Sequence, residues 1–167
     1  AGPGSAAKCV SRATADSAAL SSRAVRLRNA VPTALSGNVI GGSAAGLACG
    51  KCLQDQGLDF VILEQSDQIA QKWRNHYDRL HLHTSKDWSE LPGKQYARDL
   101  PKYPPKQAVV DYLVAYAQEN RLQPIFNTTV RQVRRTNDGR WEVLIDGENS
   151  YTADTVIMAA GMNHTPK

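Results

Sequence analysis

The spacing of apolar positions in the first half of the chain predicts a strand, a helix and a second strand. The first strand is expected to be short, because only Val39-Ile40 is strongly strand-forming and Ser36-Gly37-Asn38 before it is typical of a turn. From Ala44 onward, small or apolar residues recur at helical spacing, at positions 45, 48, 49, 52 and 53. Gly57 should end this helix, and the apolar run at 58–63 predicts a buried strand.

The second half of the chain predicts a further helix and two more parallel strands. Residues 106–122 have an amphipathic pattern. Its apolar stripe consists of Val109, Leu113, Tyr116 and Ala117. Residues 125–130, after Pro124, are expected to form the third parallel strand, and residues 154–161 a buried parallel strand that ends at Gly161.

A β-meander is predicted between these two strands. Residues 133–136 and 141–145 are joined by Asn137-Asp138-Gly139, which is a strong hairpin signal. Residues 146–149 are predicted to form a second turn. The fold class is therefore α/β, with a parallel sheet and a three-stranded antiparallel meander.

The turn between the first strand and its helix carries the chemistry that is easiest to interpret. It contains Gly41, Gly42, Ser43 and Gly46, and Glu64 follows the second strand 18 residues beyond Gly46. Glycines let the backbone approach a pyrophosphate, the helix N-terminus binds its charge, and a carboxylate at this spacing accepts hydrogen bonds from ribose hydroxyls. A dinucleotide site is predicted. A helix that merely begins in a glycine-rich turn, or a domain that binds NAD(H), remains an alternative.

Charge and composition narrow the function classes. The net charge is +4, and residues 1–36 account for all of it with five basic side chains and one acidic side chain, so no global field favours nucleic acid. This leader is rich in Ala, Ser and Arg, as in an organelle transit peptide or a disordered tail, and a short helix at 17–28 is possible. Residues 37–167 are then one domain. Three cysteines and no run long enough to span a bilayer indicate a cytoplasmic or organellar protein without a disulfide framework.

Residues 64–103 make the interpretation more specific. They contain Ile69-Ala70-Gln71-Lys72-Trp73-Arg74, then Tyr77-Asp78-Arg79-Leu80-His81-Leu82-His83-Thr84, then Leu91-Pro92 and Tyr103-Pro104. With the glycine turn and Ala160-Gly161, this pattern resembles the flavin-containing monooxygenase family, most closely its YUCCA-like class. The resemblance runs from about Val39 to Pro166.

The resemblance implies a Rossmann-like, three-layer domain of the glutathione-reductase type that binds FAD, with NADPH as co-substrate. It implies that Glu64 binds the adenosine ribose, that Trp73 and Arg74 lie near the flavin and pyrophosphate, and that Val130 lies against the adenine. The complete set of implied FAD contacts is Gly41, Gly42, Ser43, Ala44, Ala45, Gly46, Glu64, Gln65, Trp73, Arg74, Thr84, Val130, Ala160 and Gly161. Without the resemblance, core packing is the favoured explanation for Trp73 and a solvated surface charge that for Arg74.

The chain also departs from the family pattern. Ser43 stands where the glycine motif expects glycine, Ala70-Gln71 where many relatives have Gly-Gly, and Ala160 where threonine is usual. His81 and His83 alternate on an expected strand, but a structural role for them is favoured over a metal site because no ligand cluster supports one. Cys49 and Cys52 are expected to be buried small residues on the core face of the first helix rather than a redox pair.

Two functions follow from these observations. In the first, the chain is all or part of an FAD- and NADPH-dependent monooxygenase that oxygenates a small organic substrate, such as indole-3-pyruvate, through a C4a-hydroperoxyflavin. No residue is assignable as its general acid or base. In the second, the chain is an FAD-binding module without turnover that acts as a binding protein, because no second glycine-rich loop for NADPH is present. A partner subunit could then supply the NADPH domain.

Overall fold

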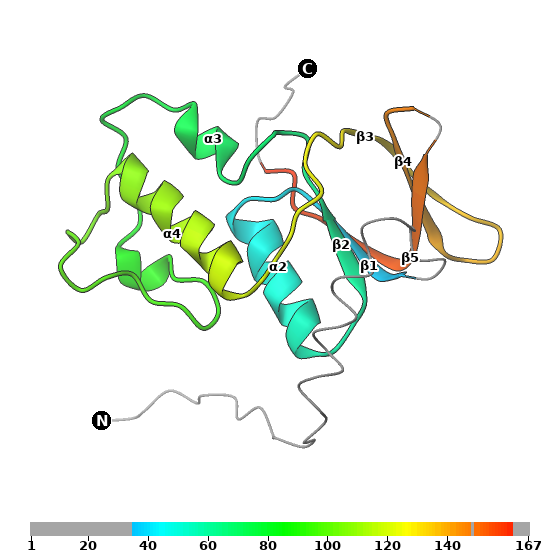
Figure 1. Ribbon diagram of the computed structural model, residues 1–167, viewed down its shortest axis with the longest axis horizontal. Helices are drawn as coiled ribbons and strands as arrows, with labels where there is room; N and C mark the ends of the chain where they lie inside the picture. Colours follow the sequence, from blue (N-terminus) through cyan, green and yellow to red (C-terminus); the bar gives the residue numbers. More distant parts are fainter. Residues whose placement is uncertain (1–34, 148, 162–167) are drawn as a thin grey trace. The chain divides into compact units, whose positions relative to one another are not determined.

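The computed structural model describes residues 35–147 and 149–161, and the expectations for residues 1–34 and for the end of the resemblance at Pro166 lie outside them. The elements in chain order are β1 (Leu35–Ile40), α2 (Ala44–Asp55), β2 (Phe60–Leu63), α3 (Gln71–Arg74), the 3-10 helix η2 (Lys86–Trp88), α4 (Lys106–Glu119), β3 (Val130–Arg135), β4 (Trp141–Ile145) and β5 (Ser150–Met158). The strands form a five-stranded mixed sheet in the order β2-β1-β5-β4-β3 (Figure 1). The α/β fold class with a Rossmann-like parallel part is confirmed.

The first strand is longer than the sequence pattern predicts. The expected turn at Ser36-Gly37-Asn38 is wrong, because these residues belong to β1, which already begins at Leu35. Gly37 and Asn38 pair in parallel on both sides, so that Gly37 lies opposite Phe60 of β2 and Thr155 of β5. Ladder hydrogen bonds to two neighbouring strands outweigh the local turn propensity of these residues.

Asn38 is a polar side chain in the centre of this sheet. It is fully buried, its Nδ2 donates a 3.3 Å hydrogen bond to the Tyr151 carbonyl, and its Oδ1 has no hydrogen-bond partner. Valine at this position would remove an unpaired buried acceptor and suits a central strand. We expect Asn38→Val to raise the free energy of unfolding by about 1–2 kcal/mol in urea denaturation.

The matched control for this substitution is Asn38→Asp, which keeps the shape and adds a buried charge. It should lower the free energy of unfolding. A loss of stability in Asn38→Val would show that the bond to the Tyr151 carbonyl outweighs the unpaired oxygen.

The helix α2 begins and ends where the sequence predicts, but it buries a different face. Its buried residues are Gly46, Leu47 and Gly50, whereas Ala45 and Cys52 of the predicted stripe are exposed. The helix is packed closely on the strands, since a Cβ at Gly50 would lie 2.7 Å from Ile62 Cδ1. Glycine therefore marks the contact face, which a pattern of apolar residues misses. After the helix, Gly57 adopts a φ of +68°, as expected for a stop signal.

Helix α4 packs against α2 and against α3, and it carries the larger core (Figure 1). The whole predicted stripe is buried. The Tyr116 hydroxyl donates to the Pro92 carbonyl, and the Tyr112 hydroxyl donates to the Lys94 carbonyl and accepts the Leu91 N–H. These bonds hold the segment between η2 and α4 on the helix, and burial raises the pKa of Tyr116 to about 12.

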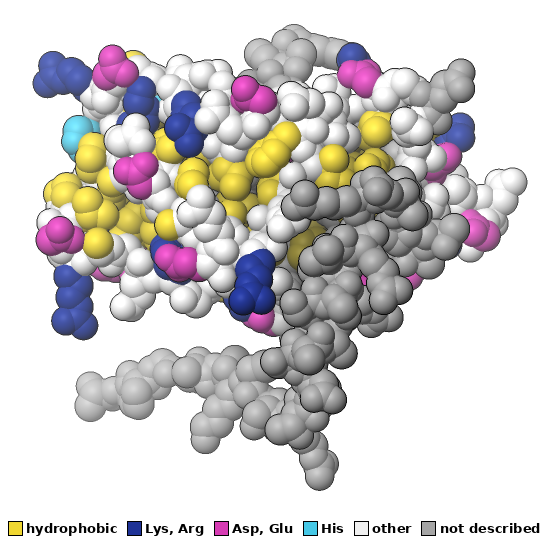
Figure 2. Space-filling model, in the orientation of Figure 1, with side chains coloured by type: hydrophobic (Ala, Val, Ile, Leu, Met, Phe, Trp, Pro, Cys, Tyr) yellow, Lys and Arg dark blue, Asp and Glu magenta, His cyan; other side chains and the backbone are white. Residues whose placement is uncertain are grey.

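On the face shown in Figure 2, apolar side chains lie over α2 and α4, with positive and negative side chains interspersed around them. Among the residues that the structure describes, no helix is long and apolar enough to cross a membrane.

The meander is confirmed, with one difference in how it joins the parallel strands. β3 and β4 form the predicted hairpin, and β4 pairs antiparallel with the first half of β5, from Ser150 to Ala153. The second half of β5 pairs in parallel with β1 up to Met158. The meander and the last parallel strand therefore share one continuous strand. β5 is not buried throughout as expected, because Met158 is 65% exposed.

The prediction of a third parallel strand at residues 125–130 is wrong. The strand is reduced to an isolated parallel bridge between Ile125 and Leu63. The Ile125 N–H donates to the Ile62 carbonyl at 2.8 Å, and the Glu64 N–H donates to the Ile125 carbonyl at 2.9 Å. Asn127 then turns the chain away with a φ of +53°. The position and direction are as predicted, but one residue with positive φ ends the ladder.

Candidate functional site

The parallel strands β1, β2 and β5 end together at one edge of the sheet. The Gly41 N–H donates to the Leu63 carbonyl at 2.8 Å, and the Ala159 N–H donates to the Ile40 carbonyl at 2.8 Å. The turn from β1 into α2 is thereby held between the last residues of its two neighbours. This is the edge at which open α/β sheets bind their ligands.

Two glycines allow the close approaches in this turn. A Cβ at Gly46 would lie 1.8 Å from the Gly41 carbonyl oxygen. A Cβ at Gly41 would lie 2.3 Å from the Ala159 carbonyl oxygen, and Gly41 has a φ of +112°. Backbone occupies the space that side chains would need, so only glycine fits at either position. The glycines predicted to bind pyrophosphate are therefore also required by the packing of the turn.

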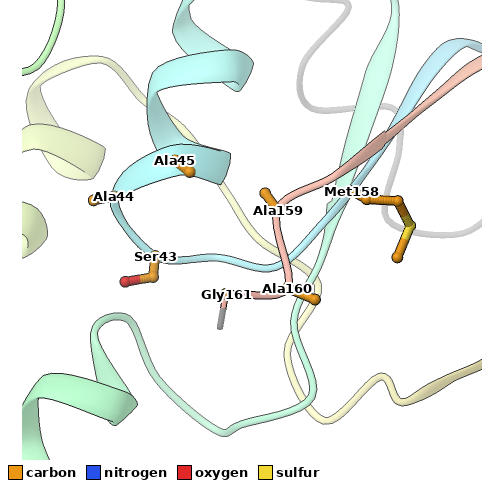
Figure 3. A pocket seen from close by; sticks show the side chains of 7 residues that line it. All are labelled: Ser43, Ala44, Ala45, Met158, Ala159, Ala160 and Gly161. Carbon is orange, nitrogen blue, oxygen red and sulfur yellow. The ribbon is translucent and has the colours of Figure 1, made fainter. Parts of the chain in front are cut away.

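A cavity of about 570 Å³ opens at this turn (Figure 3). Its lining comes from the start of α2 and the end of β5 and consists of Ser43, Ala44, Ala45, Met158, Ala159, Ala160 and Gly161. In Figure 3, Ser43 and Gly161 lie beneath the first turn of α2, which carries Ala44 and Ala45. Five of the predicted site residues thus line one cavity although more than 110 positions separate the two segments in the sequence.

The electrostatic character of the cavity comes from the N-terminus of α2. The first intrahelical bond runs from the Leu47 N–H to the Ser43 carbonyl, so the amides of the three preceding residues have no acceptor within the helix. No acidic residue lies in the first turn, and the Ser43 side chain makes no capping bond. The amides and the helix dipole therefore favour an anionic group in this cavity.

Glu64 lies beside the turn, directly after β2. Its Oε2 accepts the Gly42 N–H at 2.5 Å, and its Oε1 accepts the Ser66 N–H at 2.9 Å. A Cβ at Gly42 would approach the Glu64 side chain to 3.0 Å. The carboxylate is thus held beside the glycine turn by two backbone N–H donors.

Trp73 and Arg74 lie in α3, away from the lining of the cavity. The Trp73 ring is half-buried against the α4 core and meets the His76 ring edge-on with centroids 6.4 Å apart. The Arg74 Nε donates to the Ile69 carbonyl at 3.2 Å. Ala70, which precedes α3, has a φ of +62°. The departure from Gly-Gly therefore places alanine in a backbone conformation that favours glycine.

The remaining predicted contacts also lie outside the cavity lining. Gln65 is exposed, and Val130 is half-buried against the core on the meander side of the sheet. Thr84 is exposed, and its hydroxyl lies 2.5 Å from the Ser89 hydroxyl. Their roles toward FAD stay predictions.

The histidine and cysteine pairs have different surroundings from those expected. His81 is exposed and forms a bridge to Pro105 rather than a strand, with its Nδ1 2.9 Å from the Arg79 carbonyl oxygen. Within 35–147 and 149–161, no group of three or more His, Cys, Asp or Glu side chains is placed to hold a metal. Cys49 is half-buried, but Cys52 is exposed, so the expectation that both are buried is wrong for Cys52. The rotated face of α2 causes this difference.

Two lining residues were missed from the sequence. Met158 and Ala159 precede the predicted pair Ala160-Gly161 and belong to the same strand end. The sequence could have indicated them, because residues at the carboxyl end of a strand that pairs with β1 lie close to the glycine turn.

Comparisons with known proteins show the family to which the chain belongs. Residues 38–167 match the family model described as pyridine nucleotide-disulphide oxidoreductase. The chain is 36% identical over 130 residues to the probable indole-3-pyruvate monooxygenase YUCCA4 of Arabidopsis thaliana. That alignment covers 77% of this chain and 31% of the relative, so the chain spans about a third of the relative's length.

Solved structures show the same relationship. A flavin-containing monooxygenase from Stenotrophomonas maltophilia superimposes with a TM-score of 0.71 at 29% identity, over 80% of this chain and 41% of that chain. The OTEMO complex with FAD and NADP superimposes with a TM-score of 0.67 at 21% identity, over 76% of this chain and 26% of that chain, which shows likeness of fold. The chain therefore belongs to the pyridine nucleotide-disulphide oxidoreductase family, within which it is related to the flavin-containing monooxygenases.

Proposed function

We propose that residues 35–161 form the FAD-binding part of an NADPH-dependent flavin monooxygenase. The observation that carries the proposal is the single constellation at the end of β1, in which the glycine turn, the amides of α2 and the Glu64 carboxylate meet beside one cavity. A diphosphate with an adjoining ribose matches these groups, because the amides favour its charge and the carboxylate accepts hydrogen bonds from the ribose hydroxyls.

The residues present fit the ADP half of FAD. The cradle at Gly41 and Gly46 is kept free of side chains, and the Ser43 hydroxyl, which makes no capping bond, is available to donate to a phosphate oxygen. A small hydroxyl at the helix N-terminus adds a donor to the cavity, which supports a phosphate-binding role for serine at this position of the glycine motif. Trp73, Arg74, Thr84 and Val130 are proposed to contact the rest of the cofactor.

When bound, FAD supplies the redox and oxygen chemistry, and this part of the chain supplies binding and orientation. The described residues hold the cofactor by its ADP end, and none of them is assigned as a catalytic acid or base. The proposed substrate is a small organic acid of the indole-3-pyruvate type, as named for the plant relative. NADPH binding and turnover are proposed to need segments beyond the third of the relative's length that this chain spans, supplied by the same protein or by a partner subunit.

Reconstitution with FAD tests this proposal. The purified chain is mixed with FAD and freed of excess cofactor, and the visible flavin absorption band is recorded. Retention of flavin supports the proposal, and a chain that stays colourless overturns it. The second function, an FAD-binding module without turnover, would also retain FAD. NADPH oxidation once the remaining segments are supplied, by the same protein or by a partner subunit, supports the first function, and its absence then supports the second.

A further inference from the structure

Ser66 contributes two hydrogen-bond donors to the same carboxylate oxygen. Its N–H lies 2.9 Å and its hydroxyl 2.7 Å from Glu64 Oε1. The opposite oxygen, Oε2, receives the Gly42 N–H at 2.5 Å. Three donors from two segments therefore fix the Glu64 carboxylate, and two of them come from a residue that no part of the sequence pattern singled out.

The Ser66 hydroxyl lies within hydrogen-bond distance of two acceptors. Its oxygen lies 2.7 Å from Glu64 Oε1 and 2.9 Å from the Gln68 carbonyl oxygen, and it carries a single proton. A charged carboxylate is the stronger acceptor and is also the nearer one. The proton is therefore directed to Glu64.

Most of the hydrogen-bond acceptor positions of the Glu64 carboxylate are occupied within the protein. An ionised carboxylate offers about four lone-pair positions, two on each oxygen. The two donors of Ser66 fill Oε1, and Gly42 takes one position on Oε2, so the position that remains is on Oε2, beside the glycine turn. A ribose hydroxyl bound there would meet a carboxylate that cannot rotate away.

We propose that Ser66 is a positioning residue for Glu64, which orients Oε2 toward the ribose of the bound nucleotide. This inference rests on the proposed function, because it takes the ligand to be an ADP-containing cofactor. Ser66 acts through the carboxylate and does not itself touch the ligand. Removal of the Ser66 hydroxyl should weaken the binding only of ligands that carry ribose hydroxyls.

The experiment compares ADP with 2′,3′-dideoxy-ADP, which lacks both ribose hydroxyls, by titration calorimetry on the full chain. Ser66→Ala should weaken the binding of ADP and FAD by about fivefold, as expected for the loss of one hydrogen bond, and should leave the affinity for dideoxy-ADP within about twofold. Ser66→Thr keeps the hydroxyl and should bind ADP as the unaltered chain does. In a Glu64→Gln background, Ser66→Ala should have little further effect on ADP.

Several results would overturn the inference. An equal loss for ADP and dideoxy-ADP would indicate general loosening of the turn, and an unchanged ADP affinity would show that the amides alone position Glu64. Binding of neither nucleotide by the unaltered chain would overturn it as well. Failure of the proposed function is distinguishable, because a chain that discriminates the two nucleotides through Ser66 but does not retain FAD rejects the flavin proposal and keeps the positioning role.

Discussion

Gly46→Ala is expected to lower the free energy of unfolding by about 3 kcal/mol or more. The new Cβ would lie 1.8 Å from the Gly41 carbonyl oxygen and 2.9 Å from the Gly41 carbonyl carbon. Both are backbone atoms of the turn that leads into the helix, so no side-chain rotation relieves the overlap. The helix must move away from the turn, and the cavity at its N-terminus changes shape. Urea denaturation monitored by circular dichroism measures the loss.

The same helix provides the control. A Cβ at Gly50 would meet Ile62 Cδ1 at 2.7 Å, which is the end of a flexible side chain. The gain in helix propensity on replacing glycine with alanine, about 1 kcal/mol, partly offsets the repacking of Ile62. Gly50→Ala should therefore cost much less than Gly46→Ala. Equal losses for the two variants would show that the close approach of the turn to α2 is not what requires Gly46.

Glu64→Ala is expected to weaken FAD binding by about 50-fold, which follows from losing a charged acceptor of ribose hydroxyls in a partly buried site. The substitution also leaves the Gly42 N–H and both donors of Ser66 without their acceptor. Quenching of flavin fluorescence on titration with the chain measures the change. The affinity should fall without loss of the sheet, because Glu64 follows β2 and the substitution keeps the backbone N–H that donates to the Ile125 carbonyl.

Glu119→Ala is the matched control, because that carboxylate lies at the end of α4 and pairs with Lys94 on the surface. It should leave FAD affinity unchanged. If Glu64→Ala binds FAD as tightly as the unaltered chain, the ribose does not bind at this carboxylate, and the proposed orientation of the ADP half is wrong.

The sequence determined the parts of the fold that depend on local chemistry. Gly57 ends α2, Asn137-Asp138-Gly139 makes the hairpin, and the apolar stripe of α4 faces the core, each as predicted. These features are predicted correctly because the residues that determine each one lie within a few positions of it in the sequence. The glycine turn and Glu64 were found for the same reason, since their spacing along one βαβ unit fixes their distance in space.

The resemblance to flavin-containing monooxygenases, confirmed by the family match, carried the cofactor prediction further than spacing alone could. It did not decide which predicted contacts share a cavity. Ser43 and Ala160 meet there because β5 pairs beside β1, whereas Thr84 and Val130 belong to other parts of the described chain.

Only the tertiary structure decided the remaining features. Ser36-Gly37-Asn38 became strand because β2 and β5 both pair with it, and residues 125–130 shrank to a bridge because Asn127 turns the chain away. The contact face of α2 was set by where glycine lets the helix approach the sheet, which exposes Cys52. Local sequence determines turns, the ends of helices and the apolar faces of helices. Which strand lies beside which, and how closely a helix approaches them, depends on partners distant in the chain, and that pairing completes the site.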